Sequence, residues 1–247
     1  VSYIGVGEDG TVDMKAFKNA LRPETVLVSV MYVNNEIGMI QPIAEISKAI
    51  RNFRKSNNFN EKQPIFFHSD MSQAPLYLQV RLERLGVDSA TFDAHKMYGP
   101  KGVGALFVKR GIAISPIVFG GGQEGGLRSA TENIPAIVGF AKAFELADTR
   151  RETEVSRLSA LRDYCIAQLE QKIPEARLNG SRLERVANNV NVSLSGHDGE
   201  FLVLQLDVAG IACSAKSACL HDGDGSYVVR ALGGDRDRAR GAIRFTF

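Results

Sequence analysis

Several residue types are scarce or absent in this chain of 247 residues. It has no tryptophan and three cysteines, Cys165, Cys213 and Cys219. An odd and sparse set of cysteines suits a reducing compartment better than a disulfide framework, so we expect any important cysteine to be a free thiol. The spacing from Cys213 to Cys219 matches no common zinc pattern, and no paired histidines complete a site. We therefore predict that no metal is bound.

Long apolar runs and an excess of one charge are also lacking. No uninterrupted apolar run approaches the roughly 20 residues needed to span a bilayer, and the N-terminus shows no basic-then-apolar signal pattern. Thirty Lys and Arg against 28 Asp and Glu leave a formal charge of +2, which is too balanced to indicate nucleic acid or a membrane as the main partner. We expect a cytoplasmic protein that acts on small molecules.

The residues that are present predict an α/β fold. The chain is 44% hydrophobic and 23% charged, as in an ordinary globular protein. A mostly parallel central sheet with flanking helices is indicated by helical spacing at 43–55 between short apolar runs at 25–33, 64–68, 89–92, 103–108 and 116–119.

A long helical pattern separates this part from the rest of the chain. It runs from 133 to about 173 and contains a charged stretch at 148–154, where we place a domain boundary. The prediction is a large domain over 1–150 and a smaller α+β domain over 151–247. In the smaller domain, strand-like and helix-like character alternates over 190–194, 201–206, 210–214 and 242–247.

Lys96 is the first candidate for chemistry. It follows His95 and precedes a turn that Gly99 and Pro100 would fix. A lysine that forms a Schiff base must be held at such a place and be partly desolvated, so that its amine is available. Taken alone, a surface lysine in a loop would be the simpler interpretation, and the neighbouring motifs reverse that preference.

Polar residues follow two of the predicted strands. Asp70 closes the run at 64–68 and Gln73 lies three residues later, so both can face one crevice at a strand end. A carboxylate there could pair with the pyridine nitrogen of pyridoxal phosphate (PLP) and keep it protonated, or it could cap a turn. Asn34 and Asn35 could hydrogen-bond a phenolic oxygen or simply form a turn.

Two further segments combine glycine with polar or reactive groups. The glycine-rich run at 120–131 ends at the start of the long helix, where backbone amides and hydroxyls could bind a phosphate or form a flexible loop with a helix cap. Cys219 leads into a polar, glycine-rich segment, and a thiol on a mobile loop can accept an atom from a substrate. Cys165 and Cys213 lie in apolar runs and are expected to be inert.

Five blocks together resemble one family. VNNEIG at 33–38, HSDMSQ at 68–73, AHKMYGPKG at 94–102, GGGQEGGLRSAT at 120–131 and SAC at 217–219 are similar, in order and spacing, to the cysteine desulfurases of the NifS/IscS type. The resemblance covers the chain from Val1 to Phe247. It implies a fold-type I PLP enzyme of the class V aminotransferase family, a homodimer that converts L-cysteine to L-alanine. It also implies an enzyme persulfide for a sulfur-acceptor protein of iron–sulfur cluster assembly or tRNA thiolation.

The resemblance also assigns roles by position. Lys96 would bind PLP covalently, Asp70 would pair with its pyridine nitrogen, and His95 would help to hold its phosphate. Asn35 and Gln73 would lie near its phenolic oxygen, with Asn35 also near the substrate. Thr131 would reach the phosphate of the neighbouring subunit, Arg244 would bind the substrate carboxylate, and Cys219 would receive the sulfur. An arginine suits the carboxylate because its two N–H groups match the two oxygens.

Several features depart from the family pattern. Asp93 stands where the family has a serine that donates to the phosphate, and a carboxylate there would repel a dianion. Lys216 replaces a glycine before the SAC block, and the loop from Cys219 to Ser226 is slightly short. Family members are also considerably longer, so we expect a fragment or a natural truncation.

Two alternatives remain at this point. A selenocysteine lyase or another fold-type I enzyme would share Lys96 and Asp70, although Cys219 argues against a plain aminotransferase. A non-catalytic, degenerate subunit would keep the fold without turnover. Because a fold does not dictate function, the combination of Lys96, Asp70 and Cys219 is what favours an enzyme.

Overall fold

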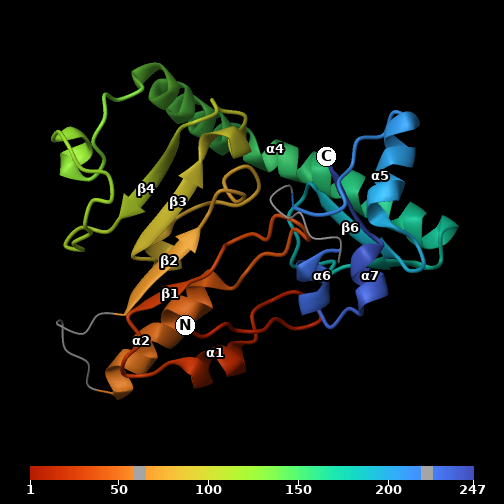
Figure 1. Ribbon diagram of the computed structural model, residues 1–247, viewed down its shortest axis with the longest axis horizontal. Helices are drawn as coiled ribbons and strands as arrows, with labels where there is room; N and C mark the ends of the chain where they lie inside the picture. The colour runs from red at the N-terminus through yellow and green to blue at the C-terminus, as the bar shows by residue number, and fades with distance from the viewer. Residues whose placement is uncertain (58–64, 218–224) are drawn as a thin grey trace.

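The computed structural model describes residues 1–57, 65–217 and 225–247. Two β-sheets lie at opposite sides of the molecule, and helix α4 (Ile134–Lys172) passes from one to the other (Figure 1). The fold is α/β, as predicted.

The larger sheet has the order β1-β2-β3-β4. Strands β1, β2 and β3 are parallel, and β4 pairs antiparallel with β3, so the sheet is mostly parallel, as predicted. Because β1, β2 and β3 run the same way, their carboxyl ends meet at one edge, where ligands of open α/β sheets bind. The strands are β1 (Leu27–Ser29), β2 (Phe66–Asp70), β3 (Ser89–Asp93) and β4 (Gly104–Val108).

Helix α2 (Ile43–Ser56) forms over the segment predicted from its spacing. Its isoleucines Ile43, Ile46 and Ile50 are buried in one apolar cluster with Phe67 of β2. These positions lie three and four residues apart and therefore share one face of the helix. Two shorter helices, which the sequence pattern did not indicate, are α1 (Met14–Ala20) and α3 (Leu82–Leu85). Each is too short to show a clear helical period.

Helix α4 contacts both sheets. Near its start, Phe140 and Ala143 pack against Ala94 and Met97 of the short helix η1 (Ala94–Met97), which follows β3. Near its end, Ile166 packs with the second sheet. The predicted domain boundary at 148–154 thus lies within one continuous helix, and the division into two domains stays a prediction. In the described part of the chain, no helix is long and apolar enough to cross a membrane.

The second sheet is antiparallel and has the order β5-β6-β7. Two predicted strand-like runs form no strand: 116–119 makes a single bridge from Val118 to Arg128, and 210–214 makes one from Ser214 to Arg244. The apolar run at 201–206 is helical, because Asp198 caps it by accepting from two backbone amides. The remaining elements are β5 (Ala176–Leu178), β6 (Asn189–Leu194), β7 (Ala242–Thr246), α5 (Gly199–Val208), α6 (Tyr227–Ala231), α7 (Arg236–Arg240) and η2 (Gln123–Gly126).

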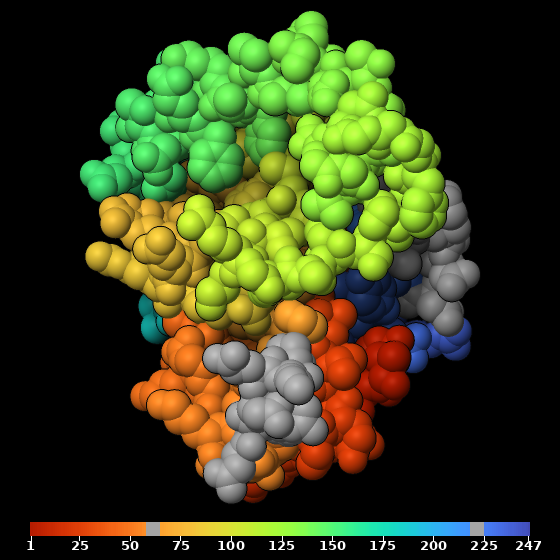
Figure 2. Space-filling model, turned by 90° about the vertical axis from the view of Figure 1, so that its left-hand side faces the viewer, coloured from red at the N-terminus to blue at the C-terminus, as the bar shows by residue number. Residues whose placement is uncertain are grey.

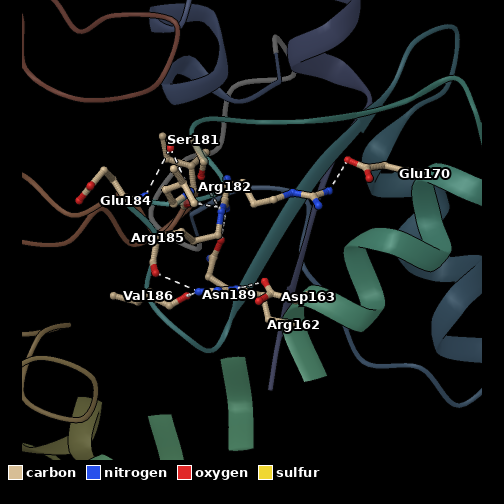
Figure 3. A network of polar contacts seen from close by, with 11 residues as sticks. Arg162, Asp163, Glu170, Ser181, Arg182, Glu184, Arg185, Val186 and Asn189 are labelled. Carbon is tan, nitrogen blue, oxygen red and sulfur yellow. Dashed lines mark hydrogen bonds and ion pairs between the residues drawn. The ribbon is translucent and has the colours of Figure 1, made fainter. Parts of the chain in front are cut away.

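A buried arginine fastens the two parts of the chain together. Arg185 is 3% exposed, and its Nη1 donates to Ile37 O at 2.6 Å and to Asn189 Oδ1 at 2.8 Å. Its Nε donates to Ser181 O (Figure 3), and its Nη2 donates to Asn179 O. Burial, together with the charge of Arg162, lowers the pKa of Arg185 to about 10, so the side chain is still charged at neutral pH. Oxygen acceptors therefore compensate for the loss of water around it.

Replacing Arg185 should be costly. Arg185→Met leaves several buried carbonyl oxygens without a donor and should lower the free energy of unfolding by at least about 2 kcal/mol. The matched control is Arg182→Met, because Arg182 forms an exposed ion pair with Glu170 and its loss should cost under about 1 kcal/mol. Urea unfolding of both variants makes the comparison, and equal losses would contradict the role given to Arg185.

Candidate active site

A cavity of about 220 Å³ lies between the segments that follow β1, β2 and β3 and residues of the second half of the chain, including Arg244 and Thr246 of β7. Four of the predicted site residues line it: Asn35, Gln73, Lys96 and Arg244. They are far apart in the sequence and come from four different segments. The remaining wall includes Val33, Asn34, Gly38, Val186, Asn188, Asn189, Ser217 and Thr246.

The parallel strands explain how three of these residues meet. Asn35 follows β1, Gln73 follows β2 and Lys96 follows β3. The carboxyl ends of the three strands share one edge of the sheet. Of the two residues expected to face one crevice there, Gln73 lines the cavity and Asp70 does not. Arg244 enters from β7 of the second sheet. The cavity therefore needs both sheets.

The turn at 34–38 separates the roles of its two asparagines. Asn34 Oδ1 accepts from the backbone amides of Glu36 and Ile37, both at 2.9 Å, so Asn34 forms the turn. Gly38 has a φ of +68°, and a Cβ there would lie 2.6 Å from Asn189 Cβ, so a side chain does not fit. The Nδ2 of Asn35 lies 3.5 Å from Ser217 Oγ across the cavity. Asn34 therefore forms the turn, and the side-chain amide of Asn35 lies at the cavity.

Lys96 lies on η1, which buries Ala94 and Met97. The other two residues of η1, His95 and Lys96, are exposed. The apolar residues of η1 face α4, and the partial desolvation expected of the Lys96 amine stays a prediction. The predicted turn after Lys96 is present: the amide of Gly99 donates to Ala94 O at 2.9 Å. It holds Lys96 at the cavity.

Asp70 is the exposed last residue of β2 and is not among the residues that line the cavity. Its Oδ1 accepts from the backbone amide of Ser72 at 2.9 Å. His68 lies two residues earlier, on the same side of the strand, and its Nδ1 lies 2.8 Å from Ser29 Oγ. Burial lowers the pKa of His68, and the charge of Asp70 acts in the opposite direction. The structure does not test the pairing of Asp70 with a cofactor, which stays a prediction.

His95 and Asp93 form a pair beside η1. Asp93 Oδ1 lies 2.6 Å from His95 Nδ1 and accepts from the backbone amide of His95 at 3.3 Å. The carboxylate expected to repel a phosphate is thus engaged by its histidine neighbour. Neither residue is among those that line the cavity, so the predicted contact of His95 with a phosphate remains untested.

Thr131 lies apart from the cavity. It is exposed and belongs to the glycine-rich segment before α4. In Figure 2 this yellow-green segment forms the surface next to the green start of α4. Thr131 therefore does not join Lys96 within one chain, and its predicted phosphate contact in a neighbouring subunit stays a prediction.

Arg244 has unused hydrogen-bonding capacity. Its Nη1 donates to Asn35 O at 2.8 Å, while its buried Nε has no hydrogen-bond partner among the described residues. Burial lowers the pKa of Arg244, and the carboxylate of Glu36 acts in the opposite direction. A buried donor without an acceptor is costly, so a ligand with an acceptor such as a carboxylate would be favoured at this wall.

Of the three cysteines, Cys165 and Cys213 are described, and Cys219 lies outside the described residues. Burial raises the pKa of both Cys165 and Cys213, and the charge of Asp207 raises that of Cys213 further. A raised pKa lowers the thiolate fraction of both residues, and their inertness stays a prediction.

Sequence reasoning gave no role to three residues at or beside the cavity: Glu36, Asn189 and Ser217. Glu36 had a visible signal, since it is the one acid within VNNEIG. Lys216, an apparent departure from the family pattern, pairs with Glu200 at 2.8 Å. The ion pair with Glu200 gives the side chain of Lys216 a partner next to Ser217.

Comparisons with known proteins find relatives that match the whole chain. "Cysteine desulfurase IscS" of Dictyoglomus turgidum is 41% identical over 247 residues, which cover 100% of this chain and 60% of that protein. "Cysteine desulfurase IscS 1" of Archaeoglobus fulgidus is 44% identical over 247 residues and is covered to 62%. A solved "NifS-like protein" is 33% identical with a TM-score of 0.88, covering 100% of this chain and 62% of that one.

This chain therefore spans about 60% of the length of the curated relatives that it resembles. The model of the aminotransferase class-V family matches residues 1–247, and enzymes of this family are PLP-dependent. Because that model covers the whole chain, the chain belongs to the aminotransferase class-V family.

Proposed function

We propose that the protein containing this chain is a PLP-dependent cysteine desulfurase, which converts L-cysteine to L-alanine and transfers the sulfur to Cys219. The observation that carries the proposal is that Lys96, Asn35, Gln73 and Arg244 all line the same cavity. Relatives named cysteine desulfurase, 41% and 44% identical over the whole chain, support the same activity.

The groups around the cavity fit the cofactor and the substrate. A lysine amine can bind the PLP aldehyde covalently, and the amides of Asn35 and Gln73 can hydrogen-bond its phenolic oxygen. The buried, unpartnered Nε of Arg244 can donate to the carboxylate of L-cysteine. Bound PLP would supply an electron sink for the substrate carbon that loses its proton.

The protein residues perform the remaining tasks. Arg244 would orient the substrate by its carboxylate, and the amine of Lys96 would take the proton from the α-carbon of the substrate as a base. Asp70 holds the proton on the pyridine nitrogen, because a nearby negative charge favours the protonated form. Lys96 and Asp70 follow or end strands of the parallel sheet, and Arg244 comes from β7 of the second sheet.

Sulfur transfer then balances without another reactant. The thiolate of Cys219 attacks the sulfur of L-cysteine, an S–S bond forms, and the substrate carbon–sulfur bond breaks with its electron pair left on carbon. That carbon gains a proton and becomes the methyl group of alanine. The sum is one thiol and one cysteine giving one persulfide and one alanine.

We further propose that the enzyme is a cytoplasmic homodimer. Thr131 does not line the cavity of its own chain and is exposed, so it is free to contact the phosphate in a second subunit. The persulfide of Cys219 would pass its sulfur to an acceptor protein, either a scaffold of iron–sulfur cluster assembly or a tRNA-thiolation enzyme.

Lys96→Ala should abolish the visible absorption of protein-bound PLP in the full-length protein, because only an amine forms the imine that gives the band. Lys101→Ala is a suitable control, since that lysine is close in sequence but does not line the cavity. A band that persists in Lys96→Ala but is lost in Lys101→Ala would assign the cofactor to the other lysine.

Asp70→Asn should retain PLP but lower the rate of alanine release at least about a hundredfold, because a neutral amide does not hold the proton on the pyridine nitrogen. Absorption spectra report cofactor content, and alanine release reports turnover. Asp88→Asn tests for a general effect of removing an acid near the sheet. Near-normal turnover by Asp70→Asn would exclude Asp70 from the mechanism.

Cys219→Ser should stop sulfur transfer, because a hydroxyl is far less nucleophilic toward sulfur and cannot store a persulfide. In the full-length wild type given L-cysteine, mass spectrometry should find one reducible sulfur on the peptide with Cys219. Cys165 and Cys213 should remain unmodified, consistent with their raised pKa values. Sulfur on Cys213, or undiminished alanine release by Cys219→Ser, would refute the assignment.

A further inference from the structure

Glu36 is a buried acid to which the proposed reaction gives no task. Its side chain is 1% exposed, and its two carboxylate oxygens accept from two different segments. Oε1 accepts from the backbone amide of Ser217 at 3.0 Å, and Oε2 accepts from Ser226 Oγ at 2.6 Å. Ser217 lies two residues before Cys219, and Ser226 lies seven residues after it. One carboxylate thus binds the chain on both sides of the proposed sulfur acceptor.

The backbone of Glu36 is fixed by hydrogen bonds, and this fixes the position from which its carboxylate projects. Asn189 Nδ2 and Asn191 Nδ2 each donate to Glu36 O at 3.0 Å, and the amide of Glu36 donates to Asn34 Oδ1 at 2.9 Å. Ser226 is equally buried, at 1% exposed, and its Oγ also accepts from the amide of Val229. Hydrogen bonds to a buried charge are strong, so Glu36 holds Ser217 and Ser226 next to the turn at 34–38, which also carries Asn35.

The same acid influences the arginine at the cavity. The charge of Glu36 favours the protonated form of Arg244. The Nη1 of Arg244 donates to the carbonyl of Asn35, which precedes Glu36 in the chain. Ser214, three residues before Ser217, exchanges two backbone hydrogen bonds with Arg244. The proposed substrate clamp and the segment leading to Cys219 are therefore connected to each other as well as to Glu36.

We propose that Glu36 is a positioning residue for sulfur transfer: it fixes the two points between which the chain carries Cys219, relative to Arg244. The inference rests on the proposed function, because it gives Glu36 a task only if Cys219 accepts sulfur. Glu36 acts through Ser217 and Ser226 and does not touch the reacting atoms.

A merely structural role predicts a different result. If Glu36 only supported the fold, its replacement would lower stability, cofactor content and every step of the reaction together. A positioning role predicts a split, in which cofactor content and substrate binding survive while transfer to Cys219 slows. Two variants separate these possibilities. Glu36→Gln keeps the volume but removes the charge, and Ser226→Ala removes the contact with Oε2 together with the hydrogen bond that Ser226 Oγ accepts from the amide of Val229.

The control is Glu200→Gln. Glu200 is another acid that binds this segment, through Lys216 at 2.8 Å, but its side chain is exposed. The full-length, PLP-loaded protein is used throughout. Hydrogen exchange of the Ser217 amide, which needs no turnover, measures the anchor, and the change in PLP absorption on adding L-cysteine measures substrate binding. Mass spectrometry at early times measures persulfide formation on Cys219.

In both Glu36→Gln and Ser226→Ala, persulfide formation should slow at least about tenfold, in line with the loss of a hydrogen bond to a charged group. The cysteine concentration that gives half of the absorption change should stay within about threefold of the wild-type value in Ser226→Ala, because Ser226 does not line the cavity. Exchange at Ser217 should accelerate in Glu36→Gln, and Glu200→Gln should resemble the wild type.

Persulfide formation at the wild-type rate in both variants would overturn the inference, as would a loss of transfer that merely follows lost PLP or a lower melting temperature. Failure of the proposed function is recognised separately: the wild type itself would then give no persulfide on Cys219, whatever the exchange at Ser217 shows. The inference would fall with it in that case.

Discussion

The arrangement of the site depends on three successive carbonyl groups in the turn after β1. Asn35 O accepts from Arg244, Glu36 O from Asn189 and Asn191, and Ile37 O from Arg185. All of the donors come from the second half of the chain. Buried carbonyls must find donors, and here the donors are side chains that reach across from another part of the fold. Asn35 and Glu36 are thereby bound to β7 and β6, and Ile37 is bound to the segment before β6.

This connection creates the cavity. The carboxyl ends of β1, β2 and β3 bring Asn35, Gln73 and Lys96 to one edge of the larger sheet, but that edge alone is open on one side. Arg244 on β7 and Ser217 close part of it, and both contact the turn. Polar atoms of the turn therefore serve the fold and the site at once. A substitution in the turn would affect both.

Much of the architecture and part of the site could be predicted from the sequence. The helix over 134–172 and the alternation of strands with α2 follow from clear periodicity, and the motifs indicated Lys96, Asn35, Gln73 and Arg244. The run at 116–119 is apolar but forms no strand, because local pattern does not report whether a partner strand is near. The side of η1 that packs against α4 also has no signal in the local sequence pattern.

Glu36 and Arg185 show a limit of another kind. Arg185 binds Ile37 O, 148 positions away, in addition to partners near it in the sequence, and the carboxylate of Glu36 binds Ser217 and Ser226, 181 and 190 positions away. A buried charge costs free energy unless it finds such partners, so its role becomes evident only when the fold brings the segments together. Local periodicity contains no information on such long-range contacts.

The most direct test is a crystal structure of the full-length Cys219→Ser protein grown with PLP and L-cysteine. We expect the cofactor in the cavity beside Lys96, Asn35 and Gln73, and the substrate carboxylate within hydrogen-bonding distance of Arg244 Nε, the buried donor that has no partner among the described residues. A cofactor bound elsewhere, or a substrate carboxylate held by another residue while Arg244 Nε stays without an acceptor, would contradict the proposed site.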